Sequence, residues 1–172
     1  MQALQGIQLR QRVNIVYTEH GTPHQPKDWI IFTFHTYSNE NSDAVRRLLK
    51  QLGYPVSSQE LDTRIEHIRA GGGEIFVAKD QDHIAGCINT YIDVRLAEGI
   101  CGEVVSLVVD RNYRGNGLGK QLLDHAEQWL LQQGCKNLRV RANAKRHGAN
   151  QFYVDAGYEE VKTQKIFSKN IR

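Results

Sequence analysis

The segment Arg114-Gly115-Asn116-Gly117-Leu118-Gly119-Lys120 joins two apolar patterns of different period. Before it, residues 102–110 contain a nearly continuous apolar run of strand length, which predicts a central strand covered on both faces. After it, apolar residues recur at helical spacing between Leu118 and Leu130, which predicts an amphipathic helix that ends at Gly134. The chain therefore contains a strand, a glycine-rich loop and a helix in direct succession.

A glycine-rich loop before a helix is a favourable site for an anion, because unhindered backbone N–H groups and the positive end of the helix dipole meet there. Such a loop suits a pyrophosphate. A Walker A loop requires a glycine and a serine or threonine where the chain has Arg114 and Gln121, and the dinucleotide fingerprint is spaced G-x-G-x-x-G rather than G-x-G-x-G. The simpler alternative is a tight turn that uses glycine for its backbone freedom.

The rest of the chain predicts one α+β domain without an internal repeat. Changes of period, caps and turn residues mark its elements, and one example is the capping box formed by Ser57 and Glu60 at the start of a helix. We expect strands over residues 29–37, 75–79, 84–94, 102–110 and 137–142, two short strands near 158–161 and 165–168, and helices near 45–52, 57–70, 118–130 and 149–155.

The composition is that of an ordinary soluble globular protein. Of the 172 residues, 22 are basic and 19 are acidic, which gives a formal charge of +3 without the long basic run of a nucleic-acid-binding arm. No stretch reaches the ~20 apolar residues of a membrane span, and the N-terminus lacks the pattern of a signal peptide, so a cytoplasmic protein is expected. The three cysteines and seven histidines are scattered, which argues against a disulfide framework and a metal site.

Two motifs make the chain resemble the GCN5-related N-acetyltransferase (GNAT) family. The pattern R-x-x-G-x-G over residues 114–119, placed after strand residues 105–110, looks like the acetyl-CoA-binding motif of that family. A second segment, Asn143 followed by A-x-x-F-Y-x-x-x-G-Y over residues 149–158, is similar to the second signature of the family. The two motifs also follow each other at the right separation.

The resemblance covers residues 29–172 and leaves residues 1–28 as an N-terminal extension of unclear role. It implies an α+β (mixed α/β) GNAT fold, in which a central, mostly antiparallel, twisted sheet of six to seven strands is flanked by about four helices. The cofactor cleft of this fold lies between the central strand and the strand after the main helix.

The cofactor implied by the resemblance is acetyl-CoA, the acetyl donor, and no metal is implied. In family terms the backbone of the central strand pairs with the pantetheine arm, the glycine loop takes the pyrophosphate, and two asparagines contact the arm. The implied cofactor-binding residues are Leu107, Val108, Val109, Arg114, Gly115, Asn116, Gly117, Leu118, Gly119, Lys120, Asn143 and Asn150.

The resemblance also implies catalytic roles for two side chains. An amine must lose a proton before it attacks a thioester, because an alkylammonium has a reference pKa of ~10. Glu103 lies at the start of the central strand, where some family members have a carboxylate general base, and Tyr153 is in the position of the family's general acid. The alternatives are a solvated carboxylate for Glu103 and an aromatic residue that packs the last helix for Tyr153.

The implied reaction is direct transfer of an acetyl group to a primary amine of a small molecule or of a peptide or protein. One alternative is a non-catalytic CoA-binding or sensor module that retains the fold. Another is a nucleic-acid-associated protein that uses Arg139, Arg141, Lys145 and Arg146, but few aromatic residues lie among them, so a nucleic acid is not an expected partner. A membrane is not an expected partner either, because no long apolar stretch is present. Exposed strands at the end of such a sheet would allow a homodimer, although no sequence feature demonstrates one.

Overall fold

The structure is a computed structural model, and it describes residues 30–171. The expected N-terminal extension over residues 1–28 lies outside the described residues. The chain divides into two compact units, a larger one that ends at Arg139 and a smaller one that begins at Val140. The glycine loop and the strand before it belong to the larger unit, and the second sequence motif belongs to the smaller one.

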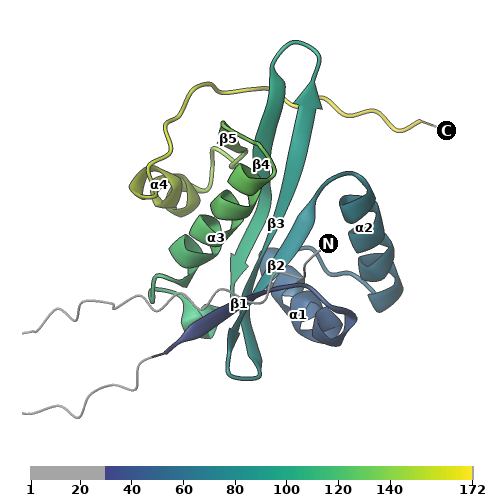
Figure 1. The fold of residues 1–172 in the computed structure, drawn as a ribbon, viewed down its shortest axis with the longest axis vertical. Helices are drawn as coiled ribbons and strands as arrows, with labels where there is room; N and C mark the ends of the chain where they lie inside the picture. The colour runs from purple at the N-terminus through teal and green to yellow at the C-terminus, as the bar shows by residue number, and fades with distance from the viewer. Residues whose placement is uncertain (1–29, 172) are drawn as a thin grey trace, which may run out of the picture. The chain divides into compact units, whose positions relative to one another are not determined.

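One sheet of five strands is formed by the described residues, and its strands follow the order of the sequence (Figure 1). Neighbours among the first four strands pair antiparallel, as predicted for most of the sheet. Gln81, in the left-handed region at φ 53°, lies in the turn between the second and third strands. The strands are β1 (Phe32–Thr36), β2 (Glu74–Asp80), β3 (His83–Arg95), β4 (Gly99–Val109) and β5 (Leu138–Val140).

Two helix ends lie at the residues that the sequence indicates. Ser57 Oγ accepts a hydrogen bond from the Glu60 N–H at 3.2 Å, and Glu60 Oε2 accepts one from the Ser57 N–H at 2.9 Å, which is the predicted capping box. Gly53 ends the preceding helix at φ 98°, a conformation that glycine adopts without strain. The helices are α1 (Ser42–Leu52), α2 (Ser58–Ala70), α3 (Leu118–Gln132) and α4 (His147–Asp155), with short 3₁₀ turns η1 (Asn39–Asn41) and η2 (Arg111–Tyr113).

In the larger unit the sheet is packed between two helical layers, with α1 and α2 on one face and α3 on the other (Figure 1). Side chains along β2 alternate between these layers: Val77 is in the core with α1 and α2, whereas Phe76 meets Trp129 of α3 edge-on, with ring centroids 5.7 Å apart. The core on the α1 and α2 side consists of Tyr37, Val45, Leu48, Val56, Leu61, Ile65, Ile75, Val77, Ile84, Cys87 and Val108.

The end of the chain differs from the sequence prediction. Residues 158–171 contain no helix or strand, so the strands expected near 158–161 and 165–168 are not formed. Apolar side chains in this segment are exposed, as in Phe167 at 89%. A strand needs a neighbour that bonds its backbone, and a run of apolar and β-branched side chains does not provide one. The described residues therefore form five strands rather than the expected six to seven.

Candidate active site

The glycine-rich loop between β4 and α3 has a shape that glycine adopts most readily. Gly115 and Gly117 have φ angles of 79° and 73°, in the left-handed region. A Cβ added to Gly115 would meet nothing within 4 Å, and one added to Gly117 would meet only the Gln121 side chain at 4.0 Å. Backbone conformation rather than lack of space therefore favours glycine here, and the outer side of the loop is open.

Gly117 is the N-cap residue of α3 and has no side chain to offer to the first N–H groups of the helix. The first N–H groups of an α-helix have no partner within the helix itself. The helix dipole adds positive potential at the same end. The loop therefore has the geometry that an anion site requires.

Hydrogen bonds attach the loop to the residues before it. Arg114 Nε donates to the carbonyl oxygen of Val109 at 3.1 Å, and Asn116 Nδ2 donates to the carbonyl oxygen of Tyr113 at 3.3 Å. The first of these bonds uses one of the five N–H donors of a guanidinium group. Arg114 thus ties the loop to the end of β4, and Asn116 ties it to η2.

A side chain of α1 supports η2, the turn that leads into the loop. Gln51 Nε2 donates to Asp110 Oδ2 at 2.9 Å, and Gln51 Oε1 accepts from the Arg111 N–H at 3.1 Å. Asp110 Oδ1 also accepts from the Asn112 N–H at 2.9 Å, and this bond is the main reason that the pKa of Asp110 is lowered. Gln51 and Asp110 are 59 residues apart, so the sequence gives no signal for their contact.

Tyr113 fixes the same turn against the ends of three strands. Its hydroxyl donates to Asp80 Oδ2 at 2.9 Å, and its ring stacks on His83 with centroids 5.6 Å apart. The ring also meets Phe32 edge-on at 6.0 Å. Desolvation raises the pKa of Tyr113, and the hydrogen bond to Asp80 raises it further. Sequence reasoning missed this support, because the contacts join β1, β2 and β3 to a turn far along the chain.

A β-bulge interrupts β4 just before the residues predicted to pair with the pantetheine arm. The pairing of β3 with β4 skips Val105, because Asn89 pairs with Ser106 and the next pair involves Val104. A bulge bends its strand and changes the direction of the residues that follow. Residues 107–109, which follow here, stay paired with β3, and their role in cofactor binding stays a prediction.

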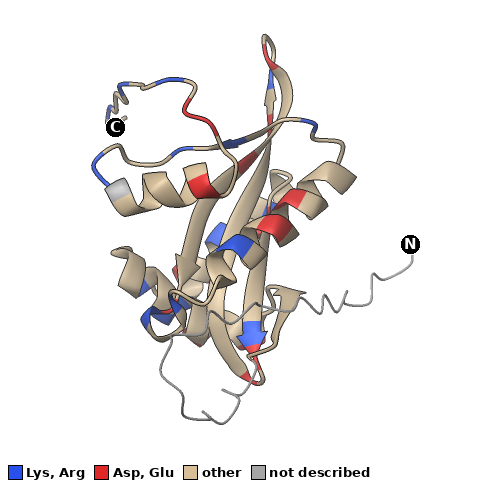
Figure 2. Ribbon diagram, turned by 90° about the vertical axis from the view of Figure 1, so that its left-hand side faces the viewer, with Lys and Arg blue, Asp and Glu red and all other residues tan. Residues whose placement is uncertain are grey.

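Glu103 on β4 is largely buried and ion-paired. Its side chain is 12% exposed, and its Oε2 accepts hydrogen bonds from Nε and Nη2 of Arg139 at 3.0 and 2.8 Å. Arg139 also bonds to Asp93 and, at 3.3 Å, to Glu98. Charges of both signs thus gather on the β3–β4 hairpin (Figure 2). Glu103 is not the solvated side chain that the simpler alternative expects.

Opposing effects act on the charged groups beside Glu103. Desolvation raises the pKa of Asp93, but hydrogen bonds from Arg139 and Arg95 lower it by more, so the net pKa lies below its usual value. For Arg139, desolvation lowers the pKa, and hydrogen bonds to Glu103 and Asp93 raise it by more. Asp93 and Arg139 are therefore both ionised at neutral pH.

Tyr153 lies on α4, in the smaller unit. Its ring meets Phe152 and Tyr158 edge-on, with centroids 5.1 and 5.9 Å away. Burial raises the pKa of Tyr153 above its usual value, so the hydroxyl keeps its proton at neutral pH. A protonated hydroxyl is what a general acid requires, and the same ring contacts are what a packing role requires.

The two predicted asparagines make local contacts in the smaller unit. Asn143 Oδ1 accepts from the Lys145 N–H at 2.9 Å, and Asn150 Nδ2 donates to the Ala144 carbonyl at 3.2 Å. Both amides thus shape the turn before α4. Their contact with a cofactor arm stays a prediction, as does the grouping of these residues with the glycine loop.

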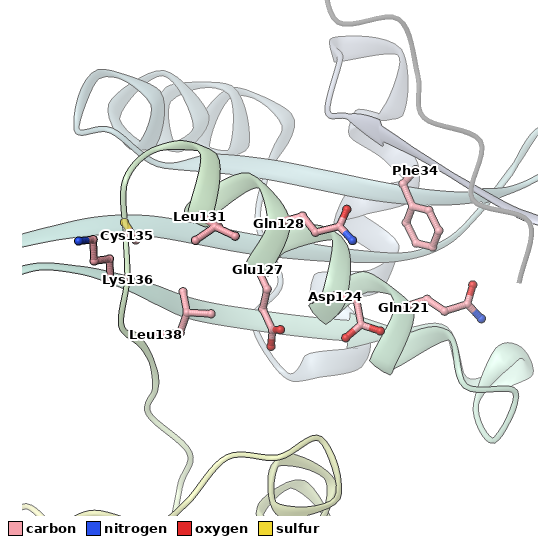
Figure 3. A pocket seen from close by; sticks show the side chains of 9 residues that line it. All are labelled: Phe34, Gln121, Asp124, Glu127, Gln128, Leu131, Cys135, Lys136 and Leu138. Carbon is pink, nitrogen blue, oxygen red and sulfur yellow. The ribbon is translucent and has the colours of Figure 1, made fainter.

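A hollow of about 390 Å³ lies along α3 (Figure 3). Phe34 of β1 and Leu138 of β5 line it together with side chains of the helix, and none of the predicted site residues is among them. Its lining contains two carboxylates, Asp124 and Glu127, against one cation, Lys136, and this balance disfavours an anionic ligand. This hollow therefore does not coincide with the expected cofactor site.

Residues 30–171 contain three free cysteines, of which Cys87 and Cys135 are buried. No group of three His, Cys, Asp or Glu side chains in this range is placed to hold a metal ion. Burial raises the pKa of Cys87 to about 12, which disfavours the thiolate that a nucleophile needs. Within the same residues, no helix has the length and apolar character needed to cross a membrane.

A family model described as the Acetyltransferase (GNAT) family matches residues 35–158, a range that includes the glycine loop, Glu103 and Tyr153. The chain belongs to the GNAT acetyltransferase family. The family predicted from the two sequence motifs is thus confirmed.

Similar proteins agree with this assignment. The chain is 39% identical over 59 residues to the aminoalkylphosphonate N-acetyltransferase of Salmonella typhimurium, a match over 34% of the chain. The matched part spans 38% of the length of that relative. Among solved structures, glucosamine-6-phosphate N-acetyltransferase from Arabidopsis thaliana superposes with a TM-score of 0.69 at 22% identity, over 81% of the chain and 99% of that protein.

A further neighbour is AAC(6')-Iy, solved in complex with the bisubstrate analog CoA-S-monomethyl-acetylneamine. It has a TM-score of 0.71 at 19% identity, over 81% of the chain and 99% of that protein. At such identities these structures establish the fold alone. The mixed α and β GNAT fold predicted from the sequence is therefore confirmed.

Proposed function

We propose that this GNAT chain transfers the acetyl group of acetyl-CoA directly to a primary amine, with both substrates bound at once. One observation carries the proposal: Gly115 and Gly117 hold the loop at the start of α3 in a left-handed shape whose outer side is open. A pyrophosphate fits such a helix start, because backbone N–H groups and the helix dipole both favour it. The family match supports acetyl-CoA as the molecule that brings the pyrophosphate.

The bound cofactor supplies an acetyl thioester, and the chain supplies the contacts that orient it. Backbone groups after the bulge at Val105 are suited to pair with amides of the pantetheine arm, in the manner of an added strand. The complex of AAC(6')-Iy with a CoA bisubstrate analog supports this choice of cofactor. The proposed cofactor-binding residues are Leu107, Val108, Val109, Arg114, Gly115, Asn116, Gly117, Leu118, Gly119, Lys120, Asn143 and Asn150.

Glu103 is the proposed general base. An amine acceptor arrives mostly as its ammonium form, whose reference pKa is ~10, so a proton must leave before the nitrogen attacks. The carboxylate of Glu103 is held by two hydrogen bonds from Arg139, and it accepts the proton directly or through a water molecule. A fixed carboxylate suits this task because proton transfer requires a defined geometry.

Tyr153 is the proposed general acid. The departing sulfur needs a proton, and the Tyr153 hydroxyl carries one at neutral pH because burial raises its pKa. The ring meets Phe152 and Tyr158 edge-on.

The acceptor is proposed to be a small molecule that carries both a primary amine and a phosphorus oxyanion. The names of two relatives motivate this choice, since one is an aminoalkylphosphonate N-acetyltransferase and the other a glucosamine-6-phosphate N-acetyltransferase. Peptide and protein amines form the second class to test. Release of free CoA thiol over a panel of both classes ranks them.

We also propose a cytoplasmic location for the protein. The homodimer expected from the sequence stays a prediction.

Calorimetric titration with acetyl-CoA tests the cofactor site. The Gly117→Asp variant strains the left-handed backbone and adds a negative charge at the proposed pyrophosphate position. We expect the wild type to bind and the variant to lose at least about 100-fold in affinity. This loss corresponds to about 2.8 kcal/mol of binding free energy, at 1.4 kcal/mol for each factor of ten.

Gly134→Asp is the matched control. Gly134 also has a left-handed φ, 88°, and lies just beyond the opposite end of α3, so the same substitution carries the same charge and similar strain. We expect it to bind acetyl-CoA like the wild type. Absence of binding to the wild type would refute the acetyltransferase proposal, and equal losses in both variants would refute the position of the site.

A further inference from the structure

Arg139 of β5 bonds to carboxylates that come from other parts of the sheet. Its Nε and Nη2 donate to Glu103 of β4 at 3.0 and 2.8 Å, its Nη2 also bonds to Asp93 of β3, and its Nη1 donates to Glu98 in the hairpin turn at 3.3 Å. We propose that Arg139 is a positioning residue of the acetyl transfer, which fixes the Glu103 carboxylate where it accepts the proton of the amine. This inference rests on the proposed function.

The strand register explains why these side chains meet. Glu103 pairs with Tyr91 across the β3–β4 ladder, and Asp93 is two residues along from Tyr91, so Glu103 and Asp93 project from the same face of the sheet. β5 is the next strand after β4, which brings Arg139 beside both. The side chains of Arg139, Asp93 and Glu103 are only 19%, 20% and 12% exposed. Charges so far removed from water need fixed partners.

The contact pattern requires a guanidinium group. Three different nitrogens of Arg139 are engaged, and two of them converge on one oxygen of Glu103. A glutamate side chain has three rotatable bonds, and two converging hydrogen bonds restrict their rotation. A lysine offers a single nitrogen and cannot reproduce this geometry. We therefore expect Arg139→Lys to keep the positive charge without fixing the position of the Glu103 carboxylate.

Arg95 provides a control for the possibility that the ion-pair cluster only stabilises the fold. Arg95 donates to Asp93 at 2.7 Å and to Glu98 at 3.1 Å, so it shares two of the three carboxylates of Arg139. Arg95→Met removes the same charge from the same cluster as Arg139→Met. Only the second variant removes the two hydrogen bonds to Glu103.

Steady-state kinetics of the wild type, Arg139→Met, Arg139→Lys and Arg95→Met test the proposal, together with acetyl-CoA affinity and thermal stability. For Arg139→Met we expect kcat to fall at least about 10-fold, a part of the 10²- to 10⁴-fold that general-base catalysis supplies. We expect acetyl-CoA affinity to change less than about 3-fold, because the glycine loop is intact. Arg95→Met is expected to keep kcat within about 3-fold, and Arg139→Lys to recover only part of the loss.

A double variant separates positioning from general damage. Glu103→Gln and Arg139→Met combined are expected to be no slower than Glu103→Gln alone, because Arg139 acts through Glu103. Wild-type kcat in Arg139→Met, equal losses in both arginine variants, or full additivity in the double variant would overturn this proposal alone. A wild-type protein that fails to bind acetyl-CoA would overturn the proposed function as well.

Discussion

The hydroxyl of Tyr153 is the smallest group on which the proposed reaction depends. Tyr153→Phe removes it and keeps the ring that meets Phe152 and Tyr158. We expect kcat to fall by about 100-fold, the lower end of general-acid contributions, because the departing sulfur loses its proton donor. Acetyl-CoA affinity measured by calorimetry should stay within about 3-fold. Unchanged kcat would instead assign Tyr153 to packing of α4.

The environment of some residues could be predicted from the sequence, and that of others could not. Gly115 and Gly117 were predictable, because a glycine-rich stretch between an apolar strand and an amphipathic helix has few physical explanations. The partners of Glu103 were not, because Arg139 is 36 positions away and reaches it only after β3, β4 and β5 have assembled. The sequence predicted Glu103 at a strand start, whereas Glu103 lies within β4 (Gly99–Val109), and nothing in the sequence indicated its burial.

At the scale of elements, the contact between α3 and the sheet depends on Gly86 of β3. A Cβ at this position would lie 2.9 Å from the Leu122 side chain of α3 and 2.9 Å from the Val108 carbonyl oxygen. The carbonyl oxygen belongs to the backbone and cannot move aside as a flexible side chain can. Gly86→Ala should therefore separate the helix from the sheet. We expect unfolding free energy to fall by about 1–3 kcal/mol, the usual cost of overpacking, as measured by urea denaturation.

Gly148→Ala provides the comparison for this substitution. Gly148 lies in α4, and a Cβ there would meet nothing within 4 Å. Alanine is the better helix former by up to about 1 kcal/mol, so this variant should be as stable as the wild type or more so. A Gly86→Ala protein with wild-type stability would contradict the close approach of α3 to β3.

Element boundaries were largely predictable where local chemistry decides them. The Ser57 capping box and Gly53 mark helix ends through bonds made within a few residues. The bulge at Val105 was not predictable, because a register shift depends on two paired strands and leaves no mark in one of them. The strands expected after residue 158 failed for the same reason, since pairing is not a local property.

At the scale of the molecule, the two sequence motifs predicted the family and the fold correctly. They did so because a strand, a glycine loop and a helix specify a local geometry that the rest of the fold has to accommodate. The roles of Glu103 and Tyr153 stay predictions. They depend on bound substrates and on contacts that no linear pattern encodes.

The exposed tail has a consequence for how molecules of this protein behave toward one another. Val161, Ile166 and Phe167 are 83–89% exposed, in the segment 158–171, which carries Lys162, Lys165 and Lys169 against Glu159 and Glu160. Like charges beside apolar residues oppose edge-to-edge association of extended segments. At 1 M salt the Debye length is about 3 Å, so repulsion between the lysines of neighbouring molecules is screened. Self-association, measured by light scattering, should therefore rise with salt. Replacing Ile166 and Phe167 by serine should abolish that rise. This result would identify the lysines of the tail as colloidal stabilisers of the protein.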